Sequence, residues 1–176
     1  MRFLKCVKLI KEDYYARNTD HLTILRFVKS YIFDLNYRVV VRFRIQTYLF
    51  NKGKLFKVAA LMIRNGNLRK FGVEIGLTTK ISGGLNLHHI NGIVIGDGVK
   101  IGNKVNIFQQ VTVGKKINGY PLIGDNVTIY PGSKIIGKII VGDNAIIGAN
   151  SVVSKDIACG VIVAGVPARE ITPKGI

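Results

Sequence analysis

Aliphatic residues recur at every sixth position through most of the second half of the chain. Ten successive members of this series are Ile or Val, with one insertion of four residues before Ile123. The members are Ile95, Ile101, Ile107, Val113, Ile123, Ile129, Ile135, Val141, Ile147 and Val153. A shorter series with the same spacing precedes it (Ile75, Ile81, Leu87 and Ile93). It is out of step with the longer one by two residues, and the slip falls within residues 88–92.

A period of six residues fits neither an α-helix, which repeats every 3.6 residues, nor a simple strand, which repeats every two. It is typical of a solenoid in which each hexapeptide forms one short strand and a corner. We therefore predict a mainly β fold, a parallel β-helix whose Ile and Val side chains point inward. An antiparallel sandwich is the alternative, but it would not require a fixed sixfold register.

Two further features follow from the same repeat. The pairs Asp125-Asn126 and Asp143-Asn144 are expected at corners, where a positive φ or a local side-chain hydrogen bond is needed. Cys159 lies six residues after Val153, and its place in the series predicts an inward core residue.

The segment 1–72 lacks the six-residue period. Its apolar pattern favours short helices at 22–33, 35–50 and 54–65, although alternation in the middle segment leaves a strand open there. Glycine marks the change of pattern, because only three of the 20 glycines lie within residues 1–72. We therefore divide the chain into a helical region, residues 1–72, and a β-helix domain, residues 73–176.

Charge is distributed just as unevenly. The 176 residues carry a formal net charge of +16, of which +12 belongs to residues 1–72 and +4 to residues 73–176. Such an excess predicts an anionic partner, whether nucleic acid, membrane surface or phosphorylated substrate. The two cysteines, Cys6 and Cys159, show no metal-ligand spacing, so no metal is expected. No apolar run is long enough for a spanning helix or a signal peptide, which predicts a cytoplasmic protein.

Three stretches carry a family resemblance: GLNLHHINGIVIGDG at 84–98, IFQQVTVG at 107–114, and IIGANSVVSKDI followed by VAGVPAREI within 146–171. Residues 73–171 resemble the hexapeptide-repeat acyltransferases of the serine acetyltransferase branch. They look most like the relatives that O-acetylate bacterial capsule or exopolysaccharide sugars. The resemblance implies a left-handed parallel β-helix with a short α-helical extension, acetyl-CoA as co-substrate, and a homotrimer with sites between neighbouring β-helices.

The resemblance also implies which side chains act on the substrates. His89 matches the family's catalytic histidine, and an imidazole can take the proton of an attacking hydroxyl at neutral pH. Glu74 stands where the family has the carboxylate that orients this ring, and the alternative is a solvated corner charge. His88 replaces the Asp of serine acetyltransferases, and it either binds the acceptor or fills a corner. Tyr120 replaces a histidine that contacts the carboxylate of serine, and its ring suits stacking on a sugar.

Six more residues are implied to bind the cofactor. Small residues would line the pantetheine arm, and the resemblance places Gly114, Pro131 and Ala149 there. Ser154, Lys155 and Arg169 match positions that approach the adenine and the phosphates, where cations are expected on electrostatic grounds. For the two cations the alternative is an ordinary solvated surface.

Together these features predict an acetyl-CoA-dependent O-acetyltransferase that acts on a sugar hydroxyl of a bacterial surface polysaccharide or its precursor. Serine O-acetylation in cysteine biosynthesis is the alternative with the same chemistry, and a non-catalytic β-helix scaffold is the alternative from another class. The cationic helical region either lies on an anionic membrane at its inner face or caps a trimer with its long basic side chains. No motif of a nucleic-acid-binding protein is present in the sequence, so no nucleic-acid partner is expected.

Overall fold

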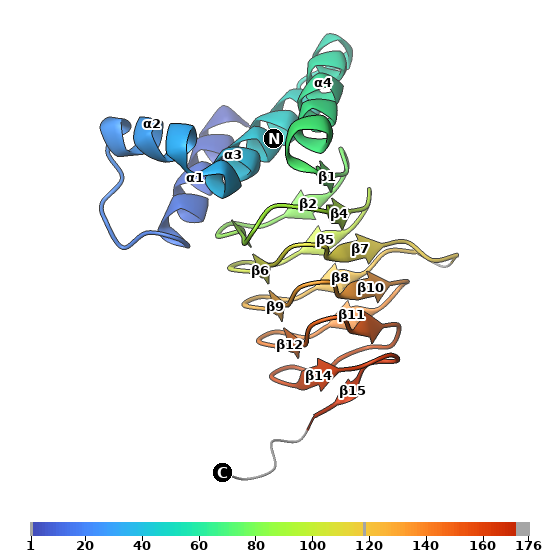
Figure 1. Ribbon diagram of the computed structural model, residues 1–176. Helices are drawn as coiled ribbons and strands as arrows, with labels where there is room; N and C mark the ends of the chain where they lie inside the picture. Colours follow the sequence, from blue (N-terminus) through green and yellow to red (C-terminus); the bar gives the residue numbers. More distant parts are fainter. Residues whose placement is uncertain (1, 118, 172–176) are drawn as a thin grey trace.

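The computed structural model describes residues 2–117 and 119–171, and it shows a helical region seated on one end of a column of β-coils (Figure 1). The helices within these residues are α1 (Phe3–Tyr15), α2 (Ile24–Phe33), α3 (Leu35–Phe50) and α4 (Lys54–Phe71). The strands of the first two coils are β1 (Val73–Ile75), β2 (Lys80–Ile81), β3 (Asn86–Leu87), β4 (Ile93–Ile95), β5 (Lys100–Ile101) and β6 (Asn106–Ile107). The next two coils hold β7 (Thr112–Gly114), β8 (Leu122–Ile123), β9 (Thr128–Ile129), β10 (Lys134–Ile136), β11 (Ile140–Val141) and β12 (Ile146–Ile147). The last strands are β13 (Val152–Val153), β14 (Ile162–Ala164) and β15 (Arg169–Glu170).

The strands form three sheets, and each sheet is one wall of the column. Wall A has the order β1-β4-β7-β10-β13, wall B has β11-β8-β5-β2, and wall C has β15-β14-β12-β9-β6-β3. The chain visits walls A, B and C in turn, and every pairing is parallel except that of β14 with β15. Each strand therefore pairs with the strands one coil above and below, and the predicted parallel β-helix is confirmed.

Coil length explains the slip in the hydrophobic series. A regular coil, such as that from Ile95 to its partner Val113, consists of three hexapeptides. The first coil, from Ile75 to its partner Ile95, is longer by two residues. These two extra residues lie between β3 and β4, in the segment that contains His89. The coil from Ile101 to Ile123 is longer still, because it contains the four-residue insertion.

The interior of the column is filled by the predicted aliphatic series. All ten side chains from Ile95 to Val153 are at most 3% exposed, as expected for inward-pointing residues. Cys159 is a correction, because it is exposed. The last coil is shorter than a regular one by two residues, since Val141 bridges Ile157 and not Cys159. Ile157 therefore takes the place next to the core, and Cys159 is displaced outward.

The Asp-Asn pairs lie at corners, as predicted. Asn126 and Asn144 have φ of +56° and +59°, a left-handed conformation that Asn tolerates better than most residues. The Asp125 carboxylate accepts a hydrogen bond from the backbone N–H of Asn103 in the coil above, at 2.6 Å. This bond, together with one from the Asn103 side chain, lowers the pKa of Asp125. The corners are therefore linked from coil to coil.

The helical region differs from the predicted one in two places. Helix α1 was not predicted, because its buried face includes Asp13 beside Cys6 and Tyr14 and therefore lacks a clear apolar stripe. Helix α4 continues past residue 65 to Phe71, where Gly72, with φ of +65°, ends it. A tertiary contact supports this last part, since Asn67 accepts a hydrogen bond from Arg42.

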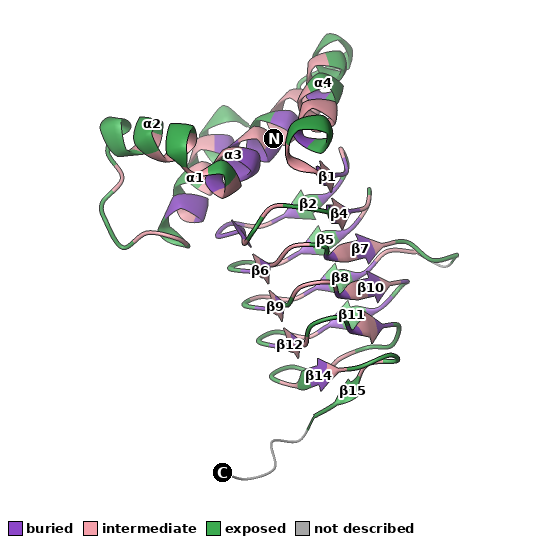
Figure 2. Cartoon of the chain, viewed as in Figure 1, coloured by how far each residue is buried: buried purple, intermediate pink, exposed green. Residues whose placement is uncertain are grey.

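Helices α1 and α3 close the upper end of the column (Figure 2). Val39, Val40 and Phe43 of α3 are at most 1% exposed and belong to the same hydrophobic cluster as the coil interior. Helix α2 and the far end of α4 lie mostly exposed. Within the described residues, no helix combines the length and the apolar character needed to cross a bilayer.

Candidate functional site

His89 stands at the edge between walls C and A, in the widened turn of the first coil. Its side chain is exposed and its φ is +51°, a conformation uncommon for a residue other than glycine. Because the turn has two residues more than a regular coil, His89 is carried out of the wall instead of packing inward.

Neighbouring elements hold the His89 turn on both sides. The side-chain oxygen of Asn36, in the first turn of α3, accepts a hydrogen bond from the backbone N–H of Ile90 at 3.2 Å. The Gly92 N–H donates to Gly72 at 2.9 Å, and the carbonyl of Asn91 accepts from Gln110 in the coil below at 2.8 Å. The helical region and the second coil together fix the backbone that presents the imidazole.

A shallow hollow of about 570 Å³ lies beside His89. It is lined by Leu35, Asn36, His89, Ile90, Asn91 and Gln109. The side-chain oxygen of Gln109 is buried and has no hydrogen-bond partner among the described residues. A buried, unpartnered amide oxygen carries a desolvation cost, which a donor on a bound substrate would relieve. The sequence pattern assigned no role to Gln109, although it lies inside the quoted string IFQQVTVG.

Glu74 lies on wall A, and its carboxylate is engaged by the helical region. It forms an ion pair with Arg64 of α4, and the two side chains are 32% and 22% exposed. No hydrogen bond joins Glu74 to His89 within the part of the chain that the structure describes. The predicted orienting role of Glu74 would therefore require its carboxylate to turn away from Arg64.

His88 is not directed at the hollow. Its ring stacks on Phe108 with centroids 4.3 Å apart, and Phe108 in turn stacks on Tyr130 at 5.2 Å. The ring nitrogen Nε2 lies 2.9 Å from the Asn86 amide and 3.1 Å from the Asn106 side-chain oxygen. His88 is thus the first member of an aromatic row that runs down the outside of wall C, one residue per coil.

Tyr120 also has packing partners of its own. Its ring covers Gly98, where an added Cβ would come within 2.7 Å of the aromatic carbons. The Lys115 ammonium lies 5.7 Å from the ring centroid, and the ring packs against the main hydrophobic cluster. The two substitutions that suggested a sugar-binding surface, at positions 88 and 120, are therefore accounted for by packing within the chain.

Two of the three residues predicted for the pantetheine arm, Pro131 and Ala149, fall along the same edge as His89, whereas Gly114 does not. Gln109, for which no role was predicted, precedes them on this edge. Gln109, Pro131 and Ala149 follow one another in successive coils, linked by backbone hydrogen bonds from Gly132 to Gln109 (3.0 Å) and from Asn150 to Pro131 (2.8 Å). Parallel strands lie about 4.8 Å apart, so this column of residues extends about 14 Å below His89. Its members at the corner are uncharged.

The other predicted cofactor residues lie on walls A and C. Gly114 ends β7, the middle strand of wall A, and Ser154 and Lys155 follow β13 and are exposed. Arg169 lies in β15 of wall C, directly after Ala168, whose N–H donates to Val152 of β13 at 2.9 Å. Two cations therefore stand at the lower end of the column, far from His89. The arrangement suits a ligand with a neutral arm and an anionic end.

A metal site would require several His, Cys, Asp or Glu side chains close together. Within residues 2–117 and 119–171, no group of three or more His, Cys, Asp and Glu side chains is placed to hold a metal ion.

Known proteins resemble this chain in sequence and in fold. A family model described as "Bacterial transferase hexapeptide (six repeats)" matches residues 120–155. The serine acetyltransferase of Buchnera aphidicola subsp. Acyrthosiphon pisum is 38% identical over 158 residues, which are 87% of this chain and 55% of that protein. The serine acetyltransferase of Salmonella typhimurium is 34% identical over 167 residues, or 93% of this chain and 60% of that one.

Solved structures of known proteins also superpose on this chain. A serine acetyltransferase in complex with CoA superposes with a TM-score of 0.83 at 33% identity, over 96% of this chain and 71% of that chain. The chain belongs to the serine acetyltransferase family. Another family member, Neisseria gonorrhoeae serine acetyltransferase in complex with serine, superposes with a TM-score of 0.84 at 29% identity, over 97% of this chain and 70% of that chain. This chain spans between 55% and 66% of the first three curated family members that it matches.

Membership of the serine acetyltransferase family corrects the expected acceptor. The sequence pattern favoured a capsule-type relative and a sugar hydroxyl, with serine as the alternative. The matched relatives are serine acetyltransferases over most of this chain, so the sugar interpretation is wrong. The error came from interpreting His88 and Tyr120 as sugar-binding residues, although their rings contact Phe108 and Gly98 of the same chain.

Proposed function

We propose that this chain is an acetyl-CoA-dependent serine O-acetyltransferase. The observation that carries the proposal is the position of His89, exposed beside a hollow at the head of the neutral column Gln109, Pro131 and Ala149. Lys155 and Arg169 supply cations at the lower end of the fold. The likeness to family members solved with CoA and with serine supports both substrates.

In the proposed reaction, His89 acts as a general base. Its imidazole takes the proton from the hydroxyl of serine as the oxygen attacks the thioester carbonyl carbon of acetyl-CoA. The tetrahedral intermediate collapses with cleavage of the C–S bond, and the imidazolium returns the proton to the leaving thiolate. The products are O-acetylserine and CoA. Gln109 lines the hollow beside His89 and is a further residue that we propose to contact the acceptor.

For the donor we propose binding along the edge between walls C and A. Pro131 and Ala149 border the pantetheine arm, and Gly114 leaves space at the other edge of wall A. Ser154 and Lys155 lie at the phosphate-bearing end with Arg169. Glu74 would orient the His89 ring once its carboxylate leaves Arg64 and pairs with the imidazole.

The proposed activity is tested by CoA release from acetyl-CoA with L-serine as acceptor. We expect serine-dependent turnover, and we expect His89→Ala to lower kcat about 100- to 10,000-fold, the usual contribution of a positioned general base. His21→Ala is the matched control, since His21 is exposed in the helical region, and its kcat should equal that of the unchanged protein. A folded protein that binds acetyl-CoA but releases no CoA with serine would refute the proposal.

We also propose that the working unit is a homotrimer. The walls carry exposed apolar side chains, among them Leu122 at 42%, Ile140 at 54% and Ile162 at 36% exposure, which a neighbouring column would cover. Light scattering after size exclusion should give a mass three times the 19.4 kDa of one chain. A monomer mass at micromolar concentration would contradict this assembly.

A peripheral contact with anionic membrane is a further part of the proposal. Helix α2 exposes Ile24, Leu25 and Phe33 by 87%, 79% and 77%, and it carries Arg26 and Lys29 without any Asp or Glu. Apolar side chains combined with cations favour the interface of an anionic bilayer. Co-sedimentation with phosphatidylglycerol vesicles should be strong, weak with neutral phosphatidylcholine vesicles, and lost in Leu25→Glu. Ile117→Glu, at an apolar side chain that is 90% exposed in the loop after β7, is the control, and equal loss in both variants would exclude α2 as the contact.

A further inference from the structure

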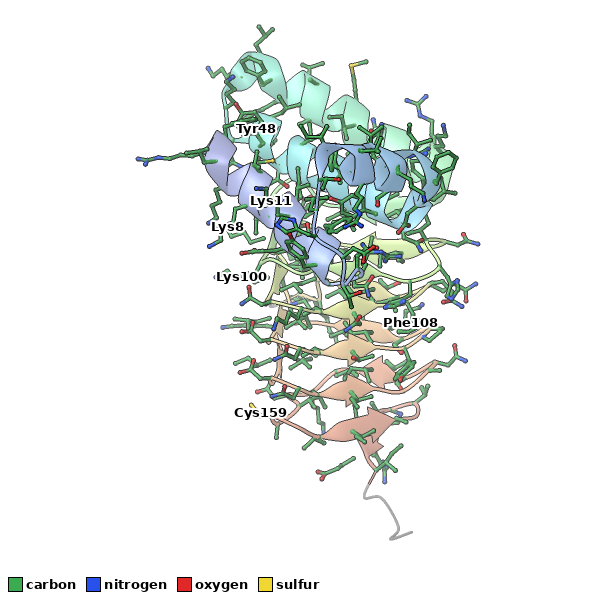
Figure 3. All side chains as sticks on the ribbon, turned by 90° about the vertical axis from the view of Figure 1, so that its left-hand side faces the viewer. Lys8, Lys11, Tyr48, Lys100, Phe108 and Cys159 are labelled. Carbon is green, nitrogen blue, oxygen red and sulfur yellow. The ribbon has the colours of Figure 1, made fainter. Side chains whose placement is uncertain are left out.

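A groove lies between α1 and wall B, on a different wall from the candidate active site. Its volume is about 950 Å³, within the usual range for sites that hold small molecules. Helix α1 forms one side with Leu4, Lys5, Lys8 and Leu9, and wall B forms the other. Figure 3 shows Lys8 of α1 and Lys100 of wall B on the same side of the molecule.

Cations dominate the rim of this groove. Lys5 and Lys8 line it from α1, and Lys80 and Lys100 line it from β2 and β5. Glu12 is the one acidic side chain in the lining, and its carboxylate pairs with Lys8 at 3.7 Å. Among residues 2–117 and 119–171, Lys5, Lys80 and Lys100 form no ion pair. Three of the four ammonium groups thus remain free to meet an anion.

Two of these lysines are neighbours in a β-ladder. Lys80 and Lys100 are register partners in the parallel pair β2–β5, and both are exposed on the outer side of wall B. Like charges placed directly opposite one another on one face of a sheet are destabilising. An anion bound between the two ammonium groups would convert this repulsion into attraction, as at phosphate sites.

The groove is also apolar on its helical side. Leu4 is 80% exposed, and Leu9 lies beside it, half-buried, on the groove face of α1. A bare inorganic anion would leave these side chains in contact with water. A ligand with an anionic group and an apolar or aromatic body would satisfy both sides.

We propose that this groove binds a soluble phosphate ester with an aromatic or apolar body, of the size of a nucleoside phosphate. The phosphates lie between Lys80 and Lys100 and are reached by Lys5 from α1. The body of the ligand covers Leu4 and Leu9. This site is separate from the donor site on wall A, so it is independent of the proposed acetyl transfer.

Calorimetric titration with ATP tests the proposal, with CoA present at saturation so that the donor site is filled. We expect binding to the unchanged protein and at least a tenfold higher Kd in Lys80→Gln/Lys100→Gln. The control is Lys116→Gln/Lys138→Gln, in the loops that follow β7 and β10, which removes the same charge outside the groove lining and should change Kd less than twofold. Leu9→Ser should weaken ATP but leave pyrophosphate unaffected, because pyrophosphate has no apolar body.

Three outcomes would overturn the proposal. They are no ATP binding, binding that disappears when CoA is added, and equal weakening in the groove and control variants. Misfolding of the groove variant is checked by its thermal midpoint. Since removal of two like charges relieves repulsion, Lys80→Gln/Lys100→Gln should melt no lower than the unchanged protein without ligand.

Discussion

The Glu74 carboxylate is paired with Arg64 and not with the His89 imidazole. In this structure the carboxylate contacts Arg64, which reaches it from α4, and the imidazole of His89 has no partner within the described residues. The family resemblance pointed to this carboxylate, and the structure locates it in β1 on wall A. It could not predict the competing cation, since the contact with Arg64 depends on how α4 lies over the first coil.

A pair of substitutions separates the two roles of Glu74. If its carboxylate serves the imidazole during turnover, Glu74→Gln should lower kcat about 10- to 100-fold, the usual effect of losing a partner that orients a ligand or base. Arg64→Gln, which frees the carboxylate, should leave kcat equal or higher. If Glu74 only pairs with Arg64, both variants should lower the thermal midpoint alike and leave kcat unchanged. Steady-state kinetics and thermal melting of the same preparations decide between the two.

The two cysteines should differ sharply in reactivity. Cys6 is 3% exposed, and burial raises the pKa of its thiol, so little thiolate is available at pH 8. Cys159 is exposed at the corner of the short last coil. Titration with a thiol reagent should therefore modify one of the two cysteines in the native protein and both in denaturant. Cys159→Ser should abolish the native reaction, and rapid native modification of Cys6 would show that α1 opens.

At the scale of elements, α1 is attached to the column by a buried ion pair. Asp13 of α1 and Arg44 of α3 are 0% and 2% exposed and are joined by two hydrogen bonds of 2.8 and 2.9 Å. Arg44 also donates to the carbonyls of Ile81 and Ser82, and Asp13 accepts from the Leu85 N–H. The two charged groups at this junction thus have partners from other elements as well as each other.

Breaking this junction should be costly. Asp13→Ala leaves the Arg44 guanidinium buried without its counter-ion, and we expect a loss of about 3–5 kcal/mol in the free energy of unfolding. Glu12→Ala, which removes the neighbouring exposed acid of α1, should cost less than about 1 kcal/mol. Urea denaturation of the two variants measures both values. A loss below about 1 kcal/mol for Asp13→Ala would mean that α1 is not held by the pair.

The junction of α1 with α3 illustrates which elements a sequence pattern can predict and which it cannot. The coils were predictable, because each Ile or Val of the series faces one narrow interior and the period records that directly. Helix α1 was not, because part of its buried face is charged and finds its partners, Arg44 and the Leu85 N–H, far away in the sequence. Cys159 was misplaced for a related reason: a periodic pattern assumes coils of constant length, and the last coil is shorter by two residues.

At the scale of the whole molecule, the helical region and the column share one core. Val39, Val40 and Phe43 of α3 pack in the same cluster as the inward residues of the coils. The division at residue 72 therefore separates two patterns of sequence, while the hydrophobic contacts run across it. The His89 turn depends on this continuity, since Asn36 of α3 holds its backbone.

Because the core is shared, we expect a destabilising substitution in α3 to destabilise the column as well. Phe43→Ala removes a side chain that is 1% exposed, and we expect a loss of about 3–5 kcal/mol. Backbone hydrogen exchange should then accelerate about 100- to 3,000-fold. The factor should be similar in α3 and in β1 to β6, because these elements open together. Phe3→Ala is the matched control, since Phe3 is 62% exposed on α1, and it should change neither region. If Phe43→Ala accelerates exchange in the helices alone, the column is stable without its helical cap. The His89 turn would then keep its shape without α3.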